Sequence, residues 1–165
     1  MKFSIQKHPR LSGQRASIYV VMNEAENETS LERFVRENNI DFQDEIRDIL
    51  QRLNTIGHKT GARMQFFKPD EGKPGDGVCA LFDNPDKHLR LYCIRNGNVT
   101  VIVGGGGEKP KQMMAFQESD KLTEENYFLR DVSRLLLERL KEKDIYYSNN
   151  GMDLEGDLIF DDTDL

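Results

Sequence analysis

The chain has 165 residues, of which 37% are hydrophobic and 32% charged, and its formal net charge is −6. This length fits one ordinary domain with a proper core. The longest apolar run is only a few residues, so we expect no transmembrane helix and no contact with a membrane. The first residues lack the apolar stretch of a signal peptide, and the two cysteines indicate no disulfide framework, so we expect a cytoplasmic protein.

Acidic residues are concentrated in the last third of the chain. Residues 1–112 hold 17 Lys and Arg against 15 Asp and Glu, whereas residues 113–165 hold 6 against 14. Neither balance reaches the strongly basic charge of a dedicated nucleic-acid-binding protein. The composition therefore permits nucleic-acid binding without indicating it.

The first part of the chain predicts one strand followed by two helices. The strand covers residues 17–22. Ser30 is the expected N-cap of a short helix over residues 31–37, and Asp41 that of a longer helix over residues 42–57. Apolar residues of the longer helix recur at the spacing of one helical face: Phe42, Ile46, Ile49, Leu50, Leu53 and Ile56.

Short strands joined by turns follow the helices. We expect strands over residues 64–68 and 78–82, and then a hairpin over residues 89–103. The hairpin turn is Asn96-Gly97, a dipeptide that accepts the positive φ angles of a tight turn. Strands connected by such short loops favour an antiparallel meander.

The last part of the chain predicts a long helix over residues 123–143 and an acidic tail. Residues 145–165 hold six acids and no base, so we expect the tail to be disordered or to dock weakly. The expected organisation is a domain over residues 1–112, a helical extension over residues 113–144 packed on it, and the tail. The fold class is α+β, with an antiparallel sheet of about four strands, the two N-terminal helices on one face and a long C-terminal helix.

The hairpin and the residues after it carry the strongest candidate chemistry. Arg90, Tyr92 and Ile94 share one face of the first hairpin strand. Four glycines then lead to Lys109 and Lys111, so an arginine, a tyrosine and two lysines are placed to hold a phosphate. Alternatively, Arg90 and Tyr92 belong to a solvated sheet face and the lysines are ordinary loop charges.

The four glycines do not match a known phosphate-binding loop. A Walker-type loop continues with Gly-Lys-Ser/Thr into a helix, whereas Glu108-Lys109-Pro110 follows here. We therefore expect a flexible exit from the last strand. The histidines and cysteines show no metal-ligand spacing, so we predict neither a metal nor a cofactor, and both cysteines are expected to be core thiols.

The segments SLERFVRE, GVCALFD and HLRLYCIRNGNVTVIVGGGGEKPK resemble the RelE/ParE superfamily of toxins, especially its phage-derived branch. In that family, a strand bearing an arginine and a tyrosine leads through a turn to an apolar strand, a glycine and basic residues. The resemblance covers about residues 17–112. It implies the toxin of a toxin–antitoxin pair, which has an antitoxin protein as partner and cleaves mRNA on the ribosome.

The resemblance also implies roles for individual residues. The RNA 2′-hydroxyl would attack the adjacent phosphate and leave a cyclic phosphate, without a metal ion. Arg90 and Lys109 would stabilise phosphate charge, with Tyr92 and His88 as proton carriers or stacking platforms. Two further basic residues, Lys111 and Arg95, would add substrate contacts, although Arg95 equally fits a surface cation.

Two other functions stay open. ParE-like members act on DNA gyrase by protein contact and do not cleave RNA. The acidic balance, with Ala80 and Leu81 where many relatives carry an arginine, also fits a catalytically inert interaction module. The C-terminal helix and tail either complete the core or cover the surface around Arg90 and Lys109 as a bound antitoxin would.

Overall fold

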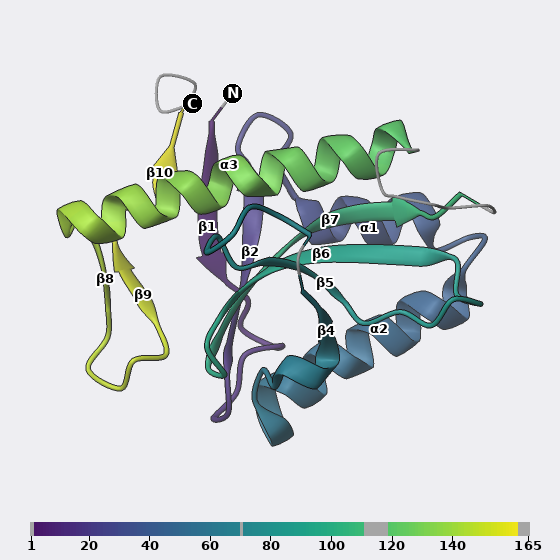
Figure 1. Ribbon diagram of the computed structural model, residues 1–165, viewed down its shortest axis with the longest axis horizontal. Coiled ribbons are helices and arrows are strands. Elements are labelled where there is room, and N and C mark those ends of the chain that lie inside the picture. The colour runs from purple at the N-terminus through teal and green to yellow at the C-terminus, as the bar shows by residue number, and fades with distance from the viewer. Residues whose placement is uncertain (1, 70, 111–118, 162–165) are drawn as a thin grey trace.

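A single large sheet with helices on both faces forms the centre of the molecule (Figure 1). The computed structural model describes residues 2–69, 71–110 and 119–161. The strands of the large sheet are β1 (Phe3–Lys7), β2 (Ser17–Asn23), β3 (Glu28–Thr29), β4 (Phe67–Lys68), β5 (Val78–Leu81), β6 (Leu89–Asn96), β7 (Thr100–Glu108) and β10 (Ile159–Phe160). A second, two-stranded sheet consists of β8 (Ile145–Tyr147) and β9 (Leu154–Gly156).

The strand order of the large sheet is β10-β1-β2-β7-β6-β5-β4, with β3 also paired to β2. The neighbours are antiparallel except β2 and β7, which run parallel from Ser17 opposite Thr100 to Val20 opposite Val103. The expected antiparallel sheet of about four strands is therefore wrong, because the sheet is mixed and has eight strands in the described part of the chain. Strand alternation and turn residues are local signals, and they do not specify which distant strand becomes a neighbour.

The sheet is covered by the helices α1 (Ser30–Asn38), α2 (Gln43–Thr55) and α3 (Asp120–Glu142). The N-cap of α1 is Thr29 and not Ser30, since Thr29 and Glu32 form a reciprocal capping box. Helix α2 begins without a side-chain cap and runs into a π-helical turn, η1 (Ile56–Thr60). A short 3₁₀ turn, η2 (Met64–Phe66), precedes β4.

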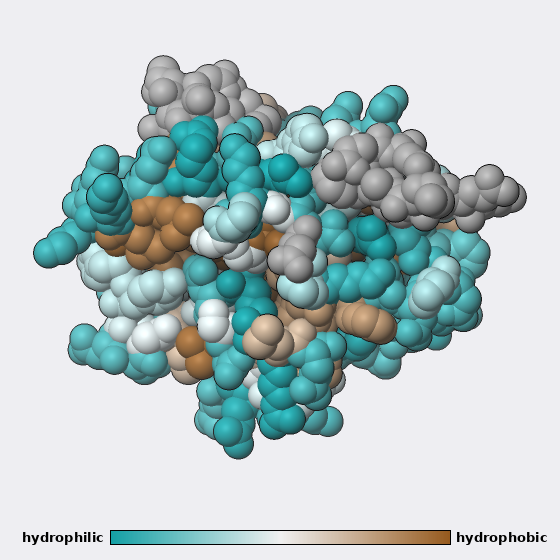
Figure 2. Space-filling view, viewed as in Figure 1, coloured by the Kyte–Doolittle hydropathy of each residue, from teal (hydrophilic) through white to brown (hydrophobic). Residues whose placement is uncertain are grey.

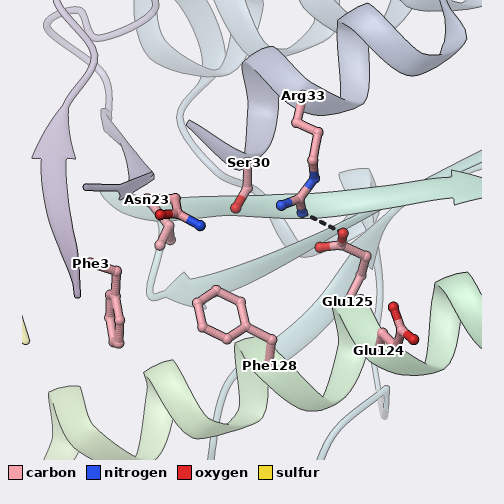
Figure 3. A pocket seen from close by; sticks show the side chains of 8 residues that line it. Phe3, Asn23, Ser30, Arg33, Glu124, Glu125 and Phe128 are labelled. Atoms are coloured by element: carbon pink, nitrogen blue, oxygen red, sulfur yellow. Dashed lines mark hydrogen bonds and ion pairs between the residues drawn. The ribbon is translucent and has the colours of Figure 1, made fainter. Parts of the chain in front are cut away.

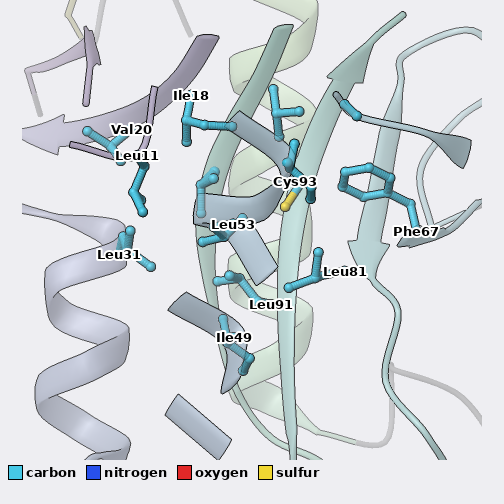
Figure 4. Close-up of a cluster of buried hydrophobic side chains, with 14 of the residues drawn as sticks. Leu11, Ile18, Val20, Leu31, Ile49, Leu53, Phe67, Leu81, Leu91 and Cys93 are labelled. Atoms are coloured by element: carbon cyan, nitrogen blue, oxygen red, sulfur yellow. The ribbon is translucent and has the colours of Figure 1, made fainter. Parts of the chain in front are cut away.

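Helices α1 and α2 pack on one face of the sheet (Figure 4). The predicted apolar stripe of α2 is confirmed, with Ile46, Ile49 and Leu53 buried. Both cysteines lie in this core and are buried free thiols, as predicted, and burial raises the pKa of Cys79 to about 12. The cluster also includes Ile18, Val20, Leu31, Phe34, Leu81, Leu89, Leu91, Val101 and Val103.

Helix α3 packs on the opposite face and crosses the glycine run of β7. The predicted flexible exit is wrong, because these glycines are buried within the strand. A Cβ at Gly104 would lie 3.0 Å from the Leu129 side chain, and one at Gly106 only 1.9 Å from the Arg90 carbonyl oxygen. Glycine is therefore required where α3 and β6 come close to the backbone of β7.

The C-terminal segment, for which the sequence predicts a tail that is disordered or docks weakly, forms β8, β9 and β10 in the part that the structure describes. Strand β10 pairs with β1, with Phe160 opposite Phe3. The β8–β9 hairpin is anchored by Asp153, which accepts a hydrogen bond from Ser17 and forms an ion pair with Lys7 at 3.0 Å. None of the described helices is long and apolar enough to cross a membrane.

Candidate functional site

Three cations meet on one buried carboxylate at the end of the sheet where β6 begins and β7 ends. Arg90 donates from Nε and Nη2 to the two Asp83 carboxylate oxygens at 3.1 and 3.3 Å. The Lys68 Nζ lies 2.8 Å from Asp83 Oδ1, and the Lys109 Nζ lies 3.5 Å from the same oxygen. We call Lys68, Asp83, Arg90 and Lys109 the Asp83 cluster.

Strand register brings the Asp83 cluster together. Arg90 lies opposite Gly107 on β7, so the chain that leaves β7 delivers Lys109 beside it. Asp83 follows the end of β5, while Lys68 ends β4, the neighbouring strand. Burial acts to raise the pKa of Asp83, but hydrogen bonds from Arg90 and Lys68 outweigh it and hold that pKa below its ordinary value. The Asp83 carboxylate is therefore ionised at neutral pH and holds the three cations around it.

A second carboxyl group, Glu71, lies close to the Asp83 cluster. Its backbone carbonyl oxygen accepts hydrogen bonds from Asn126 at 2.8 Å and Arg130 at 2.9 Å, both on α3. Burial raises the pKa of Glu71, although Arg90 and Lys68 oppose the shift. Helix α3 therefore positions the loop after β4 beside the cations.

Tyr92 lies on the same face of β6 as Arg90, as the sequence predicts, but it is fully buried. Its exposed fraction is 0%, and it belongs to the core beneath α3. Burial raises its pKa well above the ordinary tyrosine value. An RNA base cannot stack on a ring in this position, so the geometry favours a structural role for Tyr92.

His88 forms a pair with Glu45 in a surface hollow. The His88 Nδ1 lies 2.6 Å from Glu45 Oε2, and its ring stacks on Phe42 with centroids 4.8 Å apart. The hollow measures about 390 Å³ and is also lined by Ile40, Asp41, Gln43 and Asp44. The His88 side chain is 58% exposed, whereas that of Glu45 is 14% exposed. A partly buried carboxylate therefore orients a histidine that faces solvent.

The Glu45 carboxylate is held by three donors. Besides the His88 ring, the backbone N–H groups of His88 and Leu89 donate to Glu45 Oε1 at 2.8 and 3.1 Å. Burial acts to raise the pKa of Glu45, and these hydrogen bonds lower it below the ordinary value. We call this arrangement the Glu45–His88 pair.

The Glu45–His88 pair and the Asp83 cluster adjoin at the same end of the sheet. The backbone N–H of Lys109 donates to the carbonyl oxygen of His88 at 2.7 Å, so the two residues are cross-strand neighbours. Three predicted site residues, His88, Arg90 and Lys109, are thus brought together. Arg95 lies at the other end of β6 and donates to the Ala62 carbonyl oxygen at 2.7 Å.

Lys111 lies outside the described residues. Of the side chains that the structure places in or beside the site, four were missed by sequence reasoning, because strand pairs and helix packing bring them there from distant positions: Glu45, Lys68, Glu71 and Asp83. Within the described ranges, no group of three or more His, Cys, Asp or Glu side chains is arranged to hold a metal ion.

A small cavity lies elsewhere, between β1, β2, α1 and α3 (Figure 3). Phe3 and Phe128 form its apolar wall with ring centroids 5.5 Å apart, while Arg33 reaches from α1 to Glu125 on α3. Its volume of about 160 Å³ is below the roughly 300 Å³ at which small-molecule sites begin. The cavity therefore does not fit a nucleotide, and the ion pair joins two helices.

Known proteins provide no direct guide to this site. Comparisons with protein families, with curated proteins and with solved structures find no match to this chain.

Proposed function

We propose that this chain is the toxin component of a toxin–antitoxin pair and cleaves mRNA without a metal ion. The observation that carries the proposal is a solvent-facing histidine, oriented by Glu45, whose backbone carbonyl oxygen accepts a hydrogen bond from Lys109 of the Asp83 cluster. Histidine exchanges protons near neutral pH, and a carboxylate on Nδ1 fixes the ring so that Nε2 faces the substrate. The resemblance of the hairpin to RelE/ParE toxins supports the same reaction class.

His88 is the proposed proton carrier. Its Nε2 takes the proton of an RNA 2′-hydroxyl as the 2′-oxygen attacks the adjacent phosphorus. The bond from phosphorus to the 5′-oxygen then breaks, and that oxygen receives a proton from the imidazolium. The products are a 2′,3′-cyclic phosphate and a 5′-hydroxyl end, so atoms and charge balance without a co-reactant.

The Asp83 cluster is the proposed source of positive charge for the phosphate. Arg90 uses two of its nitrogens on Asp83 and the Lys109 side chain is only 9% exposed, so direct phosphate contact falls mainly to the ammonium group of Lys68, with the charge of Lys109 beside it. Preorganised charge of this kind is typically worth about 3 kcal/mol of transition-state stabilisation for each donor. Asp83 and Arg90 act as positioning residues that hold the two lysines.

Growth after inducible expression tests the proposal. Wild-type protein is expected to arrest growth, whereas His88→Gln and Lys109→Gln are expected to relieve the arrest at equal levels of soluble protein. Lys87→Gln serves as the matched control, because Lys87 is exposed and adjacent to His88 in the sequence. Normal growth with ample soluble wild-type protein, or arrest by all four proteins, would contradict the proposal.

A second candidate function is the catalytically inert interaction module. The observation that favours it is the pairing of all three cluster cations with one buried carboxylate, which leaves Arg90 only 9% exposed. A module of this kind would bind its partner without arresting growth. Capture of an antitoxin with equal affinity by wild type and His88→Gln, in cells that grow normally, would favour this function.

A further inference from the structure

Two segments of this acidic protein contain no acidic residue. Residues 1–23 and 49–69 together hold eight of the 23 Lys and Arg residues and none of the 29 Asp and Glu residues. The chain as a whole carries a net charge of −6, so the positive charge of these segments is a local concentration.

The basic loops of the two segments lie against each other in the folded chain. The backbone N–H groups of Arg15 and Ala16 both donate to the Gly57 carbonyl oxygen, at 2.9 and 3.1 Å. The His58 ring is hydrogen-bonded through Nε2 to the Arg10 carbonyl oxygen at 2.8 Å. In Figure 1, the loop between β1 and β2 and the end of α2 meet at the lower edge of the molecule.

Close packing makes this junction rigid. A Cβ at Gly57 would lie 1.9 Å from the Leu11 carbonyl oxygen, and one at Gly13 would lie 2.5 Å from His58 Nδ1. The loop that follows η1 is also fixed, since the Ala62 N–H donates to the Asn98 carbonyl oxygen at 2.7 Å. The cations on these loops therefore have defined positions relative to one another.

Four cations on these loops are exposed: Arg10, Arg15, Lys59 and Arg63. We call them the basic surface. Within the part of the chain that the structure describes, none of them forms an ion pair with a carboxylate. The lower edge of the molecule in Figure 2 is correspondingly hydrophilic.

We propose that the basic surface binds the phosphate backbone of a single-stranded nucleic acid. Three of its four cations are arginines, whose planar fork matches phosphate oxygens better than an ammonium does. Unpaired exposed cations gain affinity by displacing counterions from a polyanion, which needs no deep pocket. The surface lies at the end of the sheet opposite the Asp83 cluster, and its binding does not depend on the proposed cleavage.

An acidic protein is a poorer fit to this surface. Protein partners usually bury an apolar centre inside a polar rim. Here Leu11, Ile56 and Ala62 point into the core, with exposed fractions of 8%, 1% and 0%. Met64, which is 70% exposed, is the one large apolar side chain that the described part of these loops offers to solvent.

Binding of an oligothymidine of about 20 nucleotides tests the proposal, since this probe has no 2′-hydroxyl and cannot be cleaved by the proposed reaction. Four phosphate contacts predict a slope of about −2.8 for log K against log salt, or a loss of about 50-fold between roughly 50 and 200 mM. The variant Arg10→Gln/Arg15→Gln/Lys59→Gln/Arg63→Gln is expected to remove this salt-dependent binding.

The matched control makes the same change in net charge at four exposed lysines elsewhere: Lys2, Lys73, Lys87 and Lys141. Retention of oligothymidine binding by this control supports the proposal. Equal loss in both variants would overturn it, because net charge alone would then explain binding. Competition by polyglutamate as effective as that by oligothymidine would also overturn it, in favour of an acidic protein partner.

Discussion

The Asp83 cluster and the basic surface concentrate the same kind of charge at opposite ends of one sheet, in opposite environments. The cluster places three cations around a carboxylate that is only 5% exposed, whereas the four cations of the basic surface are exposed and face no described carboxylate. Buried cations require a counter-charge because desolvation is costly, but exposed cations are already solvated by water. Substitutions in the cluster should therefore change stability, and those in the basic surface should change binding.

The largest expected effect comes from Asp83→Asn. This substitution leaves Arg90, Lys68 and Lys109 close together without their counter-charge, and breaking a buried ion pair in this way typically costs about 3–5 kcal/mol. Denaturant unfolding measures the loss, with the exposed Asp86→Asn as control. A change below about 1 kcal/mol would show that the cluster is not a buried electrostatic unit.

Acid should remove the difference in the free energy of unfolding between wild type and Asp83→Asn. The folded-state pKa of Asp83 lies below the ordinary value of 3.8, so its contribution is complete above about pH 4 and is lost as the pH falls through the folded value. The raised pKa of Glu71 makes its own contribution to stability change with pH in the opposite direction. Glu71 is present in both proteins, so this contribution cancels when they are compared. The free energies of unfolding of wild type and Asp83→Asn, measured from about pH 8 down to pH 3, should differ by a constant amount that narrows only below about pH 4. A difference that disappears near neutral pH would contradict this assignment.

Glu45→Gln should have a smaller effect on stability. The substitution keeps one acceptor oxygen but removes the charge that His88 and two backbone N–H groups share, so we expect a loss of about 1–2 kcal/mol. His88→Gln, measured beside it, is expected to lose less, because the His88 side chain is 58% exposed. Equal losses would indicate that the pair is held together by His88 and not by Glu45.

The smallest effect on stability is expected at the basic surface. Replacing Arg10 and Arg15 by Gln should change the free energy of unfolding by no more than about 0.5 kcal/mol, because neither side chain has a described ion-pair partner. Thermal melts at low and high salt provide the measurement. A loss comparable with that of Asp83→Asn would remove the distinction between the two regions.

Local signals predicted much of the fold. The apolar stripe of α2, the hairpin of β6 and β7, and the shared face of Arg90 and Tyr92 depend on neighbouring residues and are present in the structure. The parallel pairing of β2 with β7 and the antiparallel pairing of β10 with β1 join segments far apart in the chain. The periodicity of a single strand carries no information on such partners.

The candidate site was predicted only in part, for the same reason. His88, Arg90 and Lys109 belong to one hairpin, so the sequence brings them together directly. Asp83 lies in the loop after β5, and Glu45 lies on α2. Only the folded structure shows that Asp83 pairs with Arg90 and that Glu45 orients His88. A polar sheet face and a buried ion-pair network therefore look alike in sequence.

The chemical form of the RNA ends tests the proposed function most directly. Message fragments from cells that express the wild-type protein should carry 2′,3′-cyclic phosphate and 5′-hydroxyl ends that are absent with His88→Gln. This result would identify cleavage by the 2′-hydroxyl and assign the proton carrier. Growth arrest without such ends, accompanied by inhibition of DNA supercoiling, would contradict the account and indicate a toxin that acts on gyrase by protein contact.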